Sequence, residues 1–319
     1  MSCEYSAAVL DWHRALNVRT WDDTASATRF GLTERTEPAV ELPETVWATQ
    51  FAAPRIGPPV IRVGIAGHRL HVGHFGLARD VVTLAARAQG TTVALFEGAD
   101  ARASDLFESL LRRMASTPPN IVRVDQATTV AHGRRLLEEI RFREIERIYG
   151  WAQERIARLD EVSLMLGFMF HSGSGIGQPG AAFVDANQVT HSAVAKLIAR
   201  RTALEPPWLL YRRLMPSMRG SARRASAKSV GSTAFLDEDQ AVMETLLRRA
   251  TTGGKSSASQ QRECGGSPTD CPFFSLLERT HSRSAAGEAL LNCEAGSVTC
   301  AECKAAHAPD IIRVLRGRS

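Results

Sequence analysis

One stretch decides the fold: VIRVGIAGHRLHVGH, residues 60–74. Its apolar start at 60–66 predicts a buried strand, which leads through Gly67 into a helical pattern that ends near Ala88. Residues 91–96 are again apolar and predict the next strand. The stretch therefore opens a strand–helix–strand unit, from which parallel sheets are built.

Further apolar runs at residues 121–124, 181–184 and 208–211 alternate with helical segments. The longest predicted helix covers residues 135–159, where apolar side chains recur at steps of three to five. This alternation predicts an α/β fold with a Rossmann-like, doubly wound parallel sheet. Beyond Asp237 the pattern becomes helical, which predicts a separate helical domain at the C-terminus.

The composition is that of a soluble globular protein, with 319 residues, of which 44% are hydrophobic and 23% charged. The longest apolar stretch, residues 164–170, is too short to cross a bilayer, and no basic segment precedes an apolar run near Met1. We therefore predict a cytoplasmic protein with neither signal peptide nor membrane anchor. The net charge of +5 favours a polyanionic partner without requiring one.

Two histidines lie where the first strand gives way to its helix, at the edge where open α/β sheets bind ligands. His71 and His74 are three residues apart, so both rings project from one face of the first helical turn, where phosphates are stabilised. We predict that they donate to phosphoryl oxygens and that Gly67 and Gly73 belong to the nucleotide site. Gly73 lets a nucleotide approach the backbone closely. The alternative is a pair of histidines with structural partners only.

The segment resembles the His-x-Gly-His signature of class I aminoacyl-tRNA synthetases, and further landmarks follow in the order of the tryptophanyl-tRNA synthetases. The resemblance implies the nucleotide-binding core of that class, ATP with Mg²⁺, amino-acid activation, tRNA as acceptor and a homodimer. On it we divide the chain into an N-terminal appendage at 1–57, a catalytic domain at 58–235 and a helical tRNA-binding-like domain at 236–319.

Two landmarks of the family are altered. Where the family has Asp-Gln after a strand, this chain has Asn187 and Gln188; the resemblance gives Asn187 a ribose contact and Gln188 an amino-acid contact, and the alternative for Asn187 is a helix N-cap. In the place of the Lys-Met-Ser-Lys-Ser loop stand Arg224, Ser226 and Lys228. Charge and hydroxyl are retained, so we predict a pyrophosphate clamp, against the alternative of a solvated basic loop.

The amino-acid pocket lacks the polar side chains with which the family recognises its amino acid. By register, Phe170 falls where the eukaryal and archaeal enzymes have Gln, and Gly173 where the bacterial enzymes have Asp. Tryptophan is then the expected substrate only because the chain resembles the tryptophanyl-tRNA synthetases. His171 is a candidate contact to the substrate, and the alternative is an ordinary hydrogen-bonded histidine.

Five of the six cysteines lie in the last fifth of the chain and end in Cys-x-x-Cys. Without a secretion signal, such clustering indicates a metal or cluster site more than a disulfide framework. We predict that Cys271, Cys293, Cys300 and Cys303 bind a [4Fe-4S] cluster, with Zn²⁺ as the alternative. Some bacterial tryptophanyl-tRNA synthetases have nearly this spacing around a four-iron cluster. Reduced, buried cysteines without metal are the remaining alternative.

Three functions compete at this point. The first is an aminoacyl-tRNA ligase in which positioning and charge stabilisation do the chemistry. The second is a biosynthetic paralogue that uses the adenylate or the charged tRNA in secondary metabolism. The third is a catalytically weak protein that binds tRNA, nucleotide or amino acid. A small nucleotidylyltransferase is disfavoured because it leaves the C-terminal helices and cysteines unexplained.

Overall fold

The computed structural model describes part of the chain in detail: residues 33–34, 45–48, 60–65, 67, 69–87, 91–98, 100–149, 158–171, 180–185, 188–202, 204, 208–212, 214–225, 229 and 231–317. The chain divides into two compact units. The first comprises Met1–His68 and Ala78–Arg213, and the second comprises Arg69–Leu77 and Leu214–Ser319. The histidine motif therefore groups with the C-terminal part of the chain. The predicted domain boundaries stay predictions.

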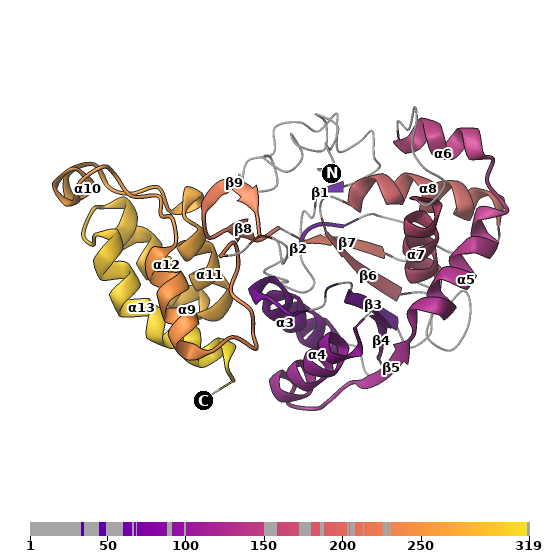
Figure 1. Ribbon diagram of the computed structural model, residues 1–319, viewed down its shortest axis with the longest axis horizontal. Coiled ribbons are helices and arrows are strands. Elements are labelled where there is room, and N and C mark those ends of the chain that lie inside the picture. The colour runs from indigo at the N-terminus through magenta and orange to yellow at the C-terminus, as the bar shows by residue number, and fades with distance from the viewer. Residues whose placement is uncertain are drawn as a thin grey trace. The chain divides into compact units, whose positions relative to one another are not determined.

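The first unit is built on a sheet with five parallel strands (Figure 1). In spatial order they are β7 (Trp208–Arg212), β6 (Gly180–Asp185), β3 (Val60–Ile65), β4 (Thr92–Glu97) and β5 (Asn120–Val124). Each lies at or within one residue of a run that the sequence predicted as a strand. The predicted α/β, doubly wound sheet is confirmed.

Two short strands extend this sheet beyond β7. They are β2 (Thr45–Ala48), which pairs antiparallel with β7, and β1 (Thr33–Glu34), which pairs antiparallel with β2. Both come from the segment predicted as an N-terminal appendage. The remainder of that segment lies outside the described residues.

The order of the strands fixes where a ligand can bind. From β3 the chain moves outward to β4 and β5, and then returns to the opposite side of β3 as β6. The helices that follow β3 and β6 therefore diverge at the carboxyl edge of the sheet, which is the usual ligand crevice of open α/β folds. Val63 and Ile65 of β3 are buried, as expected for a central strand covered on both faces.

The helices of the first unit cover both faces of the sheet (Figure 1). One face carries α4 (Ala101–Met114), and the other carries α5 (Gln126–Leu137), α7 (Arg158–Phe170) and α8 (Val189–Arg201), with α6 (Phe142–Tyr149) beside α8. The first helix, α3 (Val72–Arg87), begins in the second unit.

The single helix predicted over residues 135–159 is wrong. The structure ends α5 at Leu137 and begins α6 at Phe142, where the Glu144 carboxylate accepts the Arg141 backbone N–H at 3.0 Å. Buried Leu136, Ile140 and Ile145 continue the apolar spacing across this break, so the periodicity concealed it.

Helices α5 and α7 approach each other through glycine. A Cβ added to Gly133 would lie 1.7 Å from the Ser163 carbonyl oxygen, and one added to Gly167 would lie 1.9 Å from the Thr129 carbonyl oxygen. Gly133 of α5 thus meets α7 four residues before Gly167, and Gly167 of α7 meets α5 four residues before Gly133. This reciprocal contact sets the position of α7 on the sheet.

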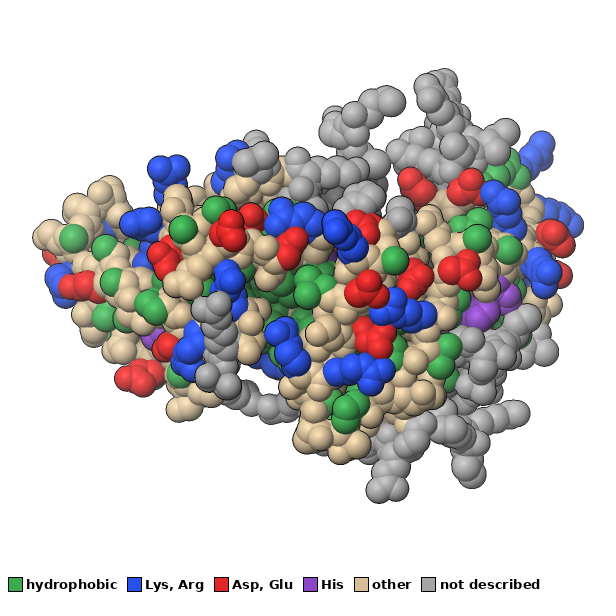
Figure 2. Space-filling view, turned by 60° about the horizontal axis from the view of Figure 1, so that its bottom comes forward, with side chains coloured by type: hydrophobic (Ala, Val, Ile, Leu, Met, Phe, Trp, Pro, Cys, Tyr) green, Lys and Arg blue, Asp and Glu red, His purple; other side chains and the backbone are tan. Residues whose placement is uncertain are grey.

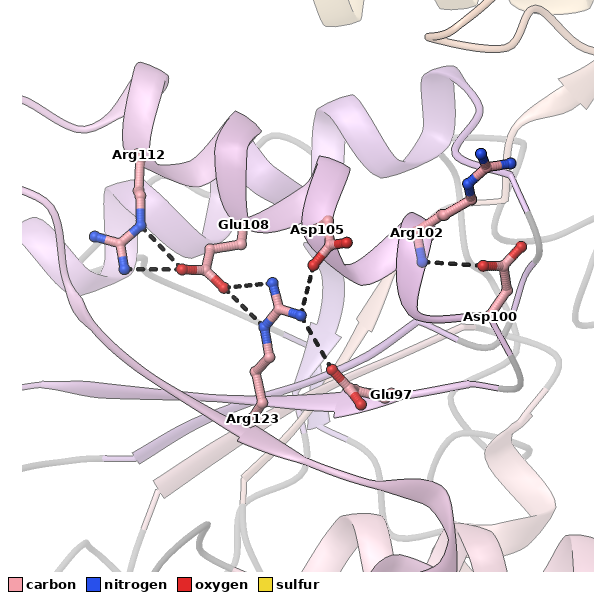
Figure 3. Close-up of polar contacts among 7 residues, drawn as sticks. All are labelled: Glu97, Asp100, Arg102, Asp105, Glu108, Arg112 and Arg123. Carbon is pink, nitrogen blue, oxygen red and sulfur yellow. Dashed lines mark hydrogen bonds and ion pairs between the residues drawn. The ribbon is translucent and has the colours of Figure 1, made fainter.

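Strand β5 forms the far edge of the sheet, and a charged network lies over it (Figure 3). Arg123 contacts Asp105 at 2.7 Å, Glu108 at 2.8 Å and Glu97 at 3.3 Å, and Glu108 also pairs with Arg112 at 2.8 Å. The hydrogen bonds that Arg123 donates to Asp105 and Glu108 raise its pKa above the ordinary value. A charged arginine on an edge strand also discourages pairing with another chain.

The second unit contains a short hairpin and five α-helices among its described residues. They are β8 (Pro216–Ser217), β9 (Gly220–Arg224), α9 (Gln240–Arg249), α10 (Ala258–Cys264), α11 (Pro272–Thr280), α12 (Arg283–Glu294) and α13 (Cys300–Leu315), with a 3₁₀ turn at Pro268–Asp270. Its core includes Leu247, Phe273 and Ile312, each at most 4% exposed. The predicted helical C-terminal region is confirmed.

One face of the described chain is charged without being dominated by one sign. On the face drawn in Figure 2, Lys and Arg side chains alternate with Asp and Glu side chains. That face therefore offers no single basic field of the kind that identifies a nucleic-acid partner. No helix in the described part of the chain combines the length and apolar character needed to cross a membrane.

Candidate functional site

The two histidines of the motif cap helix α3 reciprocally. The Nδ1 atom of His71 accepts the Gly73 backbone N–H at 3.0 Å, and the Nδ1 atom of His74 accepts the His71 backbone N–H at 3.1 Å. Their ring centroids lie 4.2 Å apart. The pattern is that of a capping box, with imidazole nitrogens in place of hydroxyl and carboxylate oxygens.

This arrangement assigns the protons of both rings. A backbone N–H can only donate, so each Nδ1 is an acceptor and each neutral ring carries its proton on Nε2. The two Nε2–H groups are therefore donors beside the positive end of a helix, which is where a phosphate is stabilised. The sequence predicted the shared face, whereas the tautomers follow only from the structure.

Gly73 is required by the same geometry. A Cβ at this position would lie 2.8 Å from Cε1 of His71, closer than real side chains come, so any larger residue would displace the ring. Gly67, the other glycine predicted for the nucleotide site, lies in a bend after β3.

Phe235 and Leu236, which follow the basic loop, lie against the histidine motif. The Val72 N–H donates to the Ala234 carbonyl at 3.0 Å, and the Leu236 N–H donates to the Leu70 carbonyl at 2.8 Å. His71 and Phe235 are paired between these two bonds. Two motifs more than 160 residues apart in sequence thus form one backbone-bonded structure.

Arg69 strengthens this junction. Its guanidinium pairs with Asp237 at 2.7 Å and stacks over the Phe235 ring at 4.0 Å. The hydrogen bond that Arg69 donates to Asp237 raises the pKa of Arg69. Because both charged groups are partly exposed, the pair orients the segment more than it stabilises the fold.

The base of the basic loop lies in the same place. The Ala225 N–H donates to the Met215 carbonyl at 2.7 Å, and the Met215 Cβ lies 3.8 Å from the position a Gly73 Cβ would take. The backbone of Arg224 ends β9. Its side chain, Ser226 and Lys228 lie outside the described residues, so the predicted clamp stays a prediction.

Polar groups also gather at the carboxyl edge of the sheet in the first unit. Gln188 accepts the Asp185 N–H at 2.8 Å through its Oε1, and its Nε2 lies 3.6 Å from the Met165 sulfur. Asp185 pairs with Arg212 of β7 at 2.8 Å. The sequence predicted Gln188 but missed Asp185 and Met165, while Asn187 lies outside the described residues.

The predicted substrate contacts Phe170 and His171 lie within the packed layer at the end of α7. Phe170 is 1% exposed. The His171 carbonyl accepts from Arg62 Nε at 2.8 Å, and its ring lies edge-on to His132 at 5.3 Å between centroids. Burial lowers the pKa of both histidines and lowers that of Arg62 to about 10. His171 therefore fits a structural role here.

A different residue of α7 borders an open position on the sheet. Gly64 of the central strand β3 is exposed, although Val63 and Ile65 beside it are buried. A Cβ at Gly64 would lie 3.6 Å from the Phe168 ring, which itself lies edge-on to Phe96 at 5.2 Å between centroids. A glycine within a central strand often marks close approach of a ligand. That signal was available in the sequence.

No protein-family model matches the chain. The tryptophan–tRNA ligase of Aeropyrum pernix is 34% identical over 128 residues, which are 38% of this chain and 34% of that protein. The chain thus matches only about a third of the length of this curated relative.

The fold extends the likeness to almost the whole chain. The crystal structure of the A. pernix tryptophanyl-tRNA synthetase has a TM-score of 0.73 at 18% identity, over 97% of this chain and 94% of that one. The tryptophanyl-tRNA synthetase homolog of Entamoeba histolytica has a TM-score of 0.74 at 12% identity, over 93% and 91%. The chain has the fold of these tryptophanyl-tRNA synthetases, as the resemblance predicted.

The four predicted cysteine ligands lie within one helical region. Cys271 caps α11, where its sulfur accepts the Phe274 N–H at 3.4 Å. Burial, with the nearby sulfurs of Cys271 and Cys293, raises the pKa of Cys303 to about 12. Cys300 begins α13, and its thiol donates to Gln261 Oε1 at 3.2 Å.

These cysteines are not arranged as a metal centre. Within the described part of the chain, which includes all four, no group of three or more His, Cys, Asp and Glu side chains is placed to hold a metal ion. All four are free thiols. The sequence thus found a gathering of cysteines, and the cluster it assigned to them stays a prediction.

Proposed function

We propose that this chain activates an amino acid with ATP. The amino-acid carboxylate attacks the α-phosphorus of Mg²⁺-bound ATP, the bond to the β-phosphate oxygen breaks, and aminoacyl adenylate and pyrophosphate form. The observation that carries the proposal is the reciprocal capping of His71 and His74 at the start of α3, which leaves the proton of each neutral ring on Nε2. Such donors stabilise charge that develops on phosphoryl oxygens.

Transfer of the aminoacyl group to the terminal adenosine of a tRNA is the second half of the proposal. It is supported by the full-length likeness of the fold to a tryptophanyl-tRNA synthetase. A homodimer in the cytoplasm belongs to the same proposal. The helical region from residue 236 onward is its candidate tRNA-binding part.

The amino-acid pocket is proposed over Gly64, between the sheet and α7. Its described border is aromatic, with Phe168 packed against Phe96. Gln188 is already bonded to Asp185 and close to Met165, which fixes its amide beside this region. An apolar side chain suits such a border, and tryptophan is one candidate among several.

Pyrophosphate exchange across a panel of amino acids tests the activity and its substrate. We expect exchange with apolar amino acids, without exclusive use of tryptophan. The variant Gly64→Ala should remain folded, because its methyl would make only ordinary contact with Phe168, yet it should raise the amino-acid KM. Exchange with tryptophan alone would show that the pocket is that of a housekeeping enzyme, and no exchange with any amino acid would refute adenylation.

The basic loop is proposed to hold the pyrophosphate as it leaves. In the double variant Arg224→Gln and Lys228→Gln, we expect the exchange rate to fall because two cations no longer offset the phosphate charge. Arg248→Gln on α9 is a matched control, since it removes a cation from another element of the same unit. A change in thermal stability without a change in exchange would make the loop structural.

A second candidate function has a specific observation behind it. The sequence keeps His71, Gly73 and His74 while it replaces the family's Asp with Asn187 and alters the basic loop. A biosynthetic paralogue that passes on its adenylate would keep the nucleotide-binding motif in this way while its other motifs change. A weakly catalytic binding protein would do the same. Exchange without aminoacylation of any tRNA would favour the paralogue.

The iron–sulfur cluster also stays a prediction. It is supported by the spacing of four cysteines and by their gathering in one helical region. Four thiolates around a cubane each bind a different iron and need not converge on one point. Iron and zinc content of anaerobically purified protein decides it, with about four irons per chain expected for a cubane.

A further inference from the structure

Two glycines leave room for the sulfurs of two of the four cysteines. A Cβ added to Gly266 would lie 2.7 Å from Sγ of Cys293, and one added to Gly254 would lie 2.5 Å from Sγ of Cys300. Real Cβ atoms essentially never come so close to another heavy atom, so any larger residue would displace the sulfur. Both sulfurs therefore occupy space that only glycine leaves open at these two positions.

Backbone conformation does not explain these two glycines. Gly265, directly before Gly266, has a φ of 70°, which favours glycine over any residue with a side chain. Neither Gly254 nor Gly266 is among the described glycines with positive φ, so alanine could adopt their backbone conformation. At Gly266 the Cys293 sulfur is the single obstacle, because the next two atoms would lie at an ordinary contact distance of 3.5 Å from the new Cβ.

The backbone around Gly266 is held in place. Its N–H donates to the Cys293 carbonyl at 2.8 Å, and the Ser267 N–H donates to the Gly253 carbonyl at 2.7 Å. Gly253 in turn approaches this segment closely, since a Cβ there would lie 1.8 Å from the Ser267 carbonyl oxygen. An alanine at position 266 would therefore have to move the Cys293 sulfur and not its own backbone.

The four sulfurs fit the proposed cluster as a group. The pKa of Cys303 is raised by burial and by the nearby Cys271, Cys293 and Cys300, so all four lie within electrostatic reach of one another. The Cys271 sulfur accepts the Phe274 N–H at 3.4 Å, and such bonds to sulfur are typical of cluster sites. Because each ligand of a cubane binds a different iron, this gathering suits a cluster better than a single ion.

We propose that Gly254 and Gly266 are positioning residues for the metal site proposed above, on which this inference rests. Gly266 leaves the place of the Cys293 sulfur open, and Gly254 that of the Cys300 sulfur. A free thiol can turn about its Cα–Cβ bond to another staggered position and make room for a methyl group. A sulfur bound to metal cannot turn in this way without leaving the site. The two glycines are therefore required for metal binding and not for the fold.

The variants Gly266→Ala and Gly254→Ala test this role in the full-length protein, purified anaerobically. Wild-type protein should contain about four irons per chain and show the visible absorption of a cluster. Each variant should lose most of its iron and absorption, while its metal-free form unfolds in urea close to the metal-free wild type. Gly287→Ala on α12 is the matched control, since an added Cβ there meets nothing within 4 Å, and it should retain its iron.

A second pair of variants tests whether the sulfur is the obstacle, should Gly266→Ala destabilise the metal-free protein. In a Cys293→Ala background the same substitution should then cost no stability, because the sulfur is gone. Gly266 suits this comparison better than Gly254, where the added Cβ would also lie 2.7 Å from Gln261 Oε1. Equal destabilisation in both backgrounds would assign Gly266 to the backbone and overturn its positioning role.

The iron measurements separate this inference from the cluster itself. Wild-type iron content and absorption in both alanine variants would overturn the role of the glycines and leave the cluster in place. Wild-type protein with neither iron nor zinc would refute the cluster and this inference with it. If the wild type holds zinc instead, zinc content is compared in the same variants. Loss of zinc then supports the positioning role, and retention overturns it.

Discussion

Amino-acid-dependent pyrophosphate exchange should fall by about 10²- to 10³-fold when either His71 or His74 is replaced by asparagine. The asparagine Oδ1 stands near the place of the imidazole Nδ1 and can still accept the backbone N–H that each histidine caps. What disappears is the Nε2–H donor. The substitution therefore removes the contact to phosphate while it retains the start of α3.

Comparing asparagine with alanine at each histidine separates the loss of exchange activity from the loss of stability. His71→Ala and His74→Ala lose the caps as well, at a cost of about 1 kcal/mol each, so their unfolding should occur at lower denaturant concentration than that of the asparagine variants. His281→Asn and His307→Asn are matched controls, since these two rings also lie near each other, at 5.3 Å between centroids. Unchanged exchange in the asparagine variants of the motif would refute its role.

The strands of the sheet could be predicted because burial on both faces leaves an uninterrupted apolar run. Residues 60–66 and 181–184 have that signal, and β3 and β6 form there. The break between α5 and α6 could not be predicted from periodicity, since buried Ile140 keeps the spacing while Glu144 caps the next helix. Local capping there prevailed over a continuous apolar face.

The candidate site was predictable to the level of its motifs. The spacing of His71 and His74 placed both on one turn, but which ring nitrogen accepts depends on backbone atoms that only the folded structure locates. Alignment with the family's motif predicted Phe170 as a substrate contact, whereas in the structure Phe168 borders the exposed Gly64. Which face of α7 meets the sheet is set by contact with α5, and that contact leaves no signal in the spacing of α7 alone.

The contact between α5 and α7 should also dominate stability in the first unit. In the variant Gly133→Ala, the new Cβ would be 1.7 Å from the Ser163 carbonyl oxygen, an atom that cannot rotate away. The helices must separate, and their buried faces lose contact. Overpacking costs about 1–3 kcal/mol, and we expect the upper end or more because the obstacle is backbone. Urea unfolding of the variant measures the loss.

The control for this prediction is Gly287→Ala on α12, where an added Cβ meets nothing within 4 Å. Alanine is favoured over glycine inside a helix by about 1 kcal/mol, so this variant should be stabilised by up to that amount. Gly167→Ala should resemble Gly133→Ala, and the double variant should cost less than the sum because one separation relieves both clashes. Since α7 carries Met165 and Phe168, Gly133→Ala should raise the amino-acid KM as well. A Gly133→Ala protein as stable as Gly287→Ala would show that the helices are not in close contact.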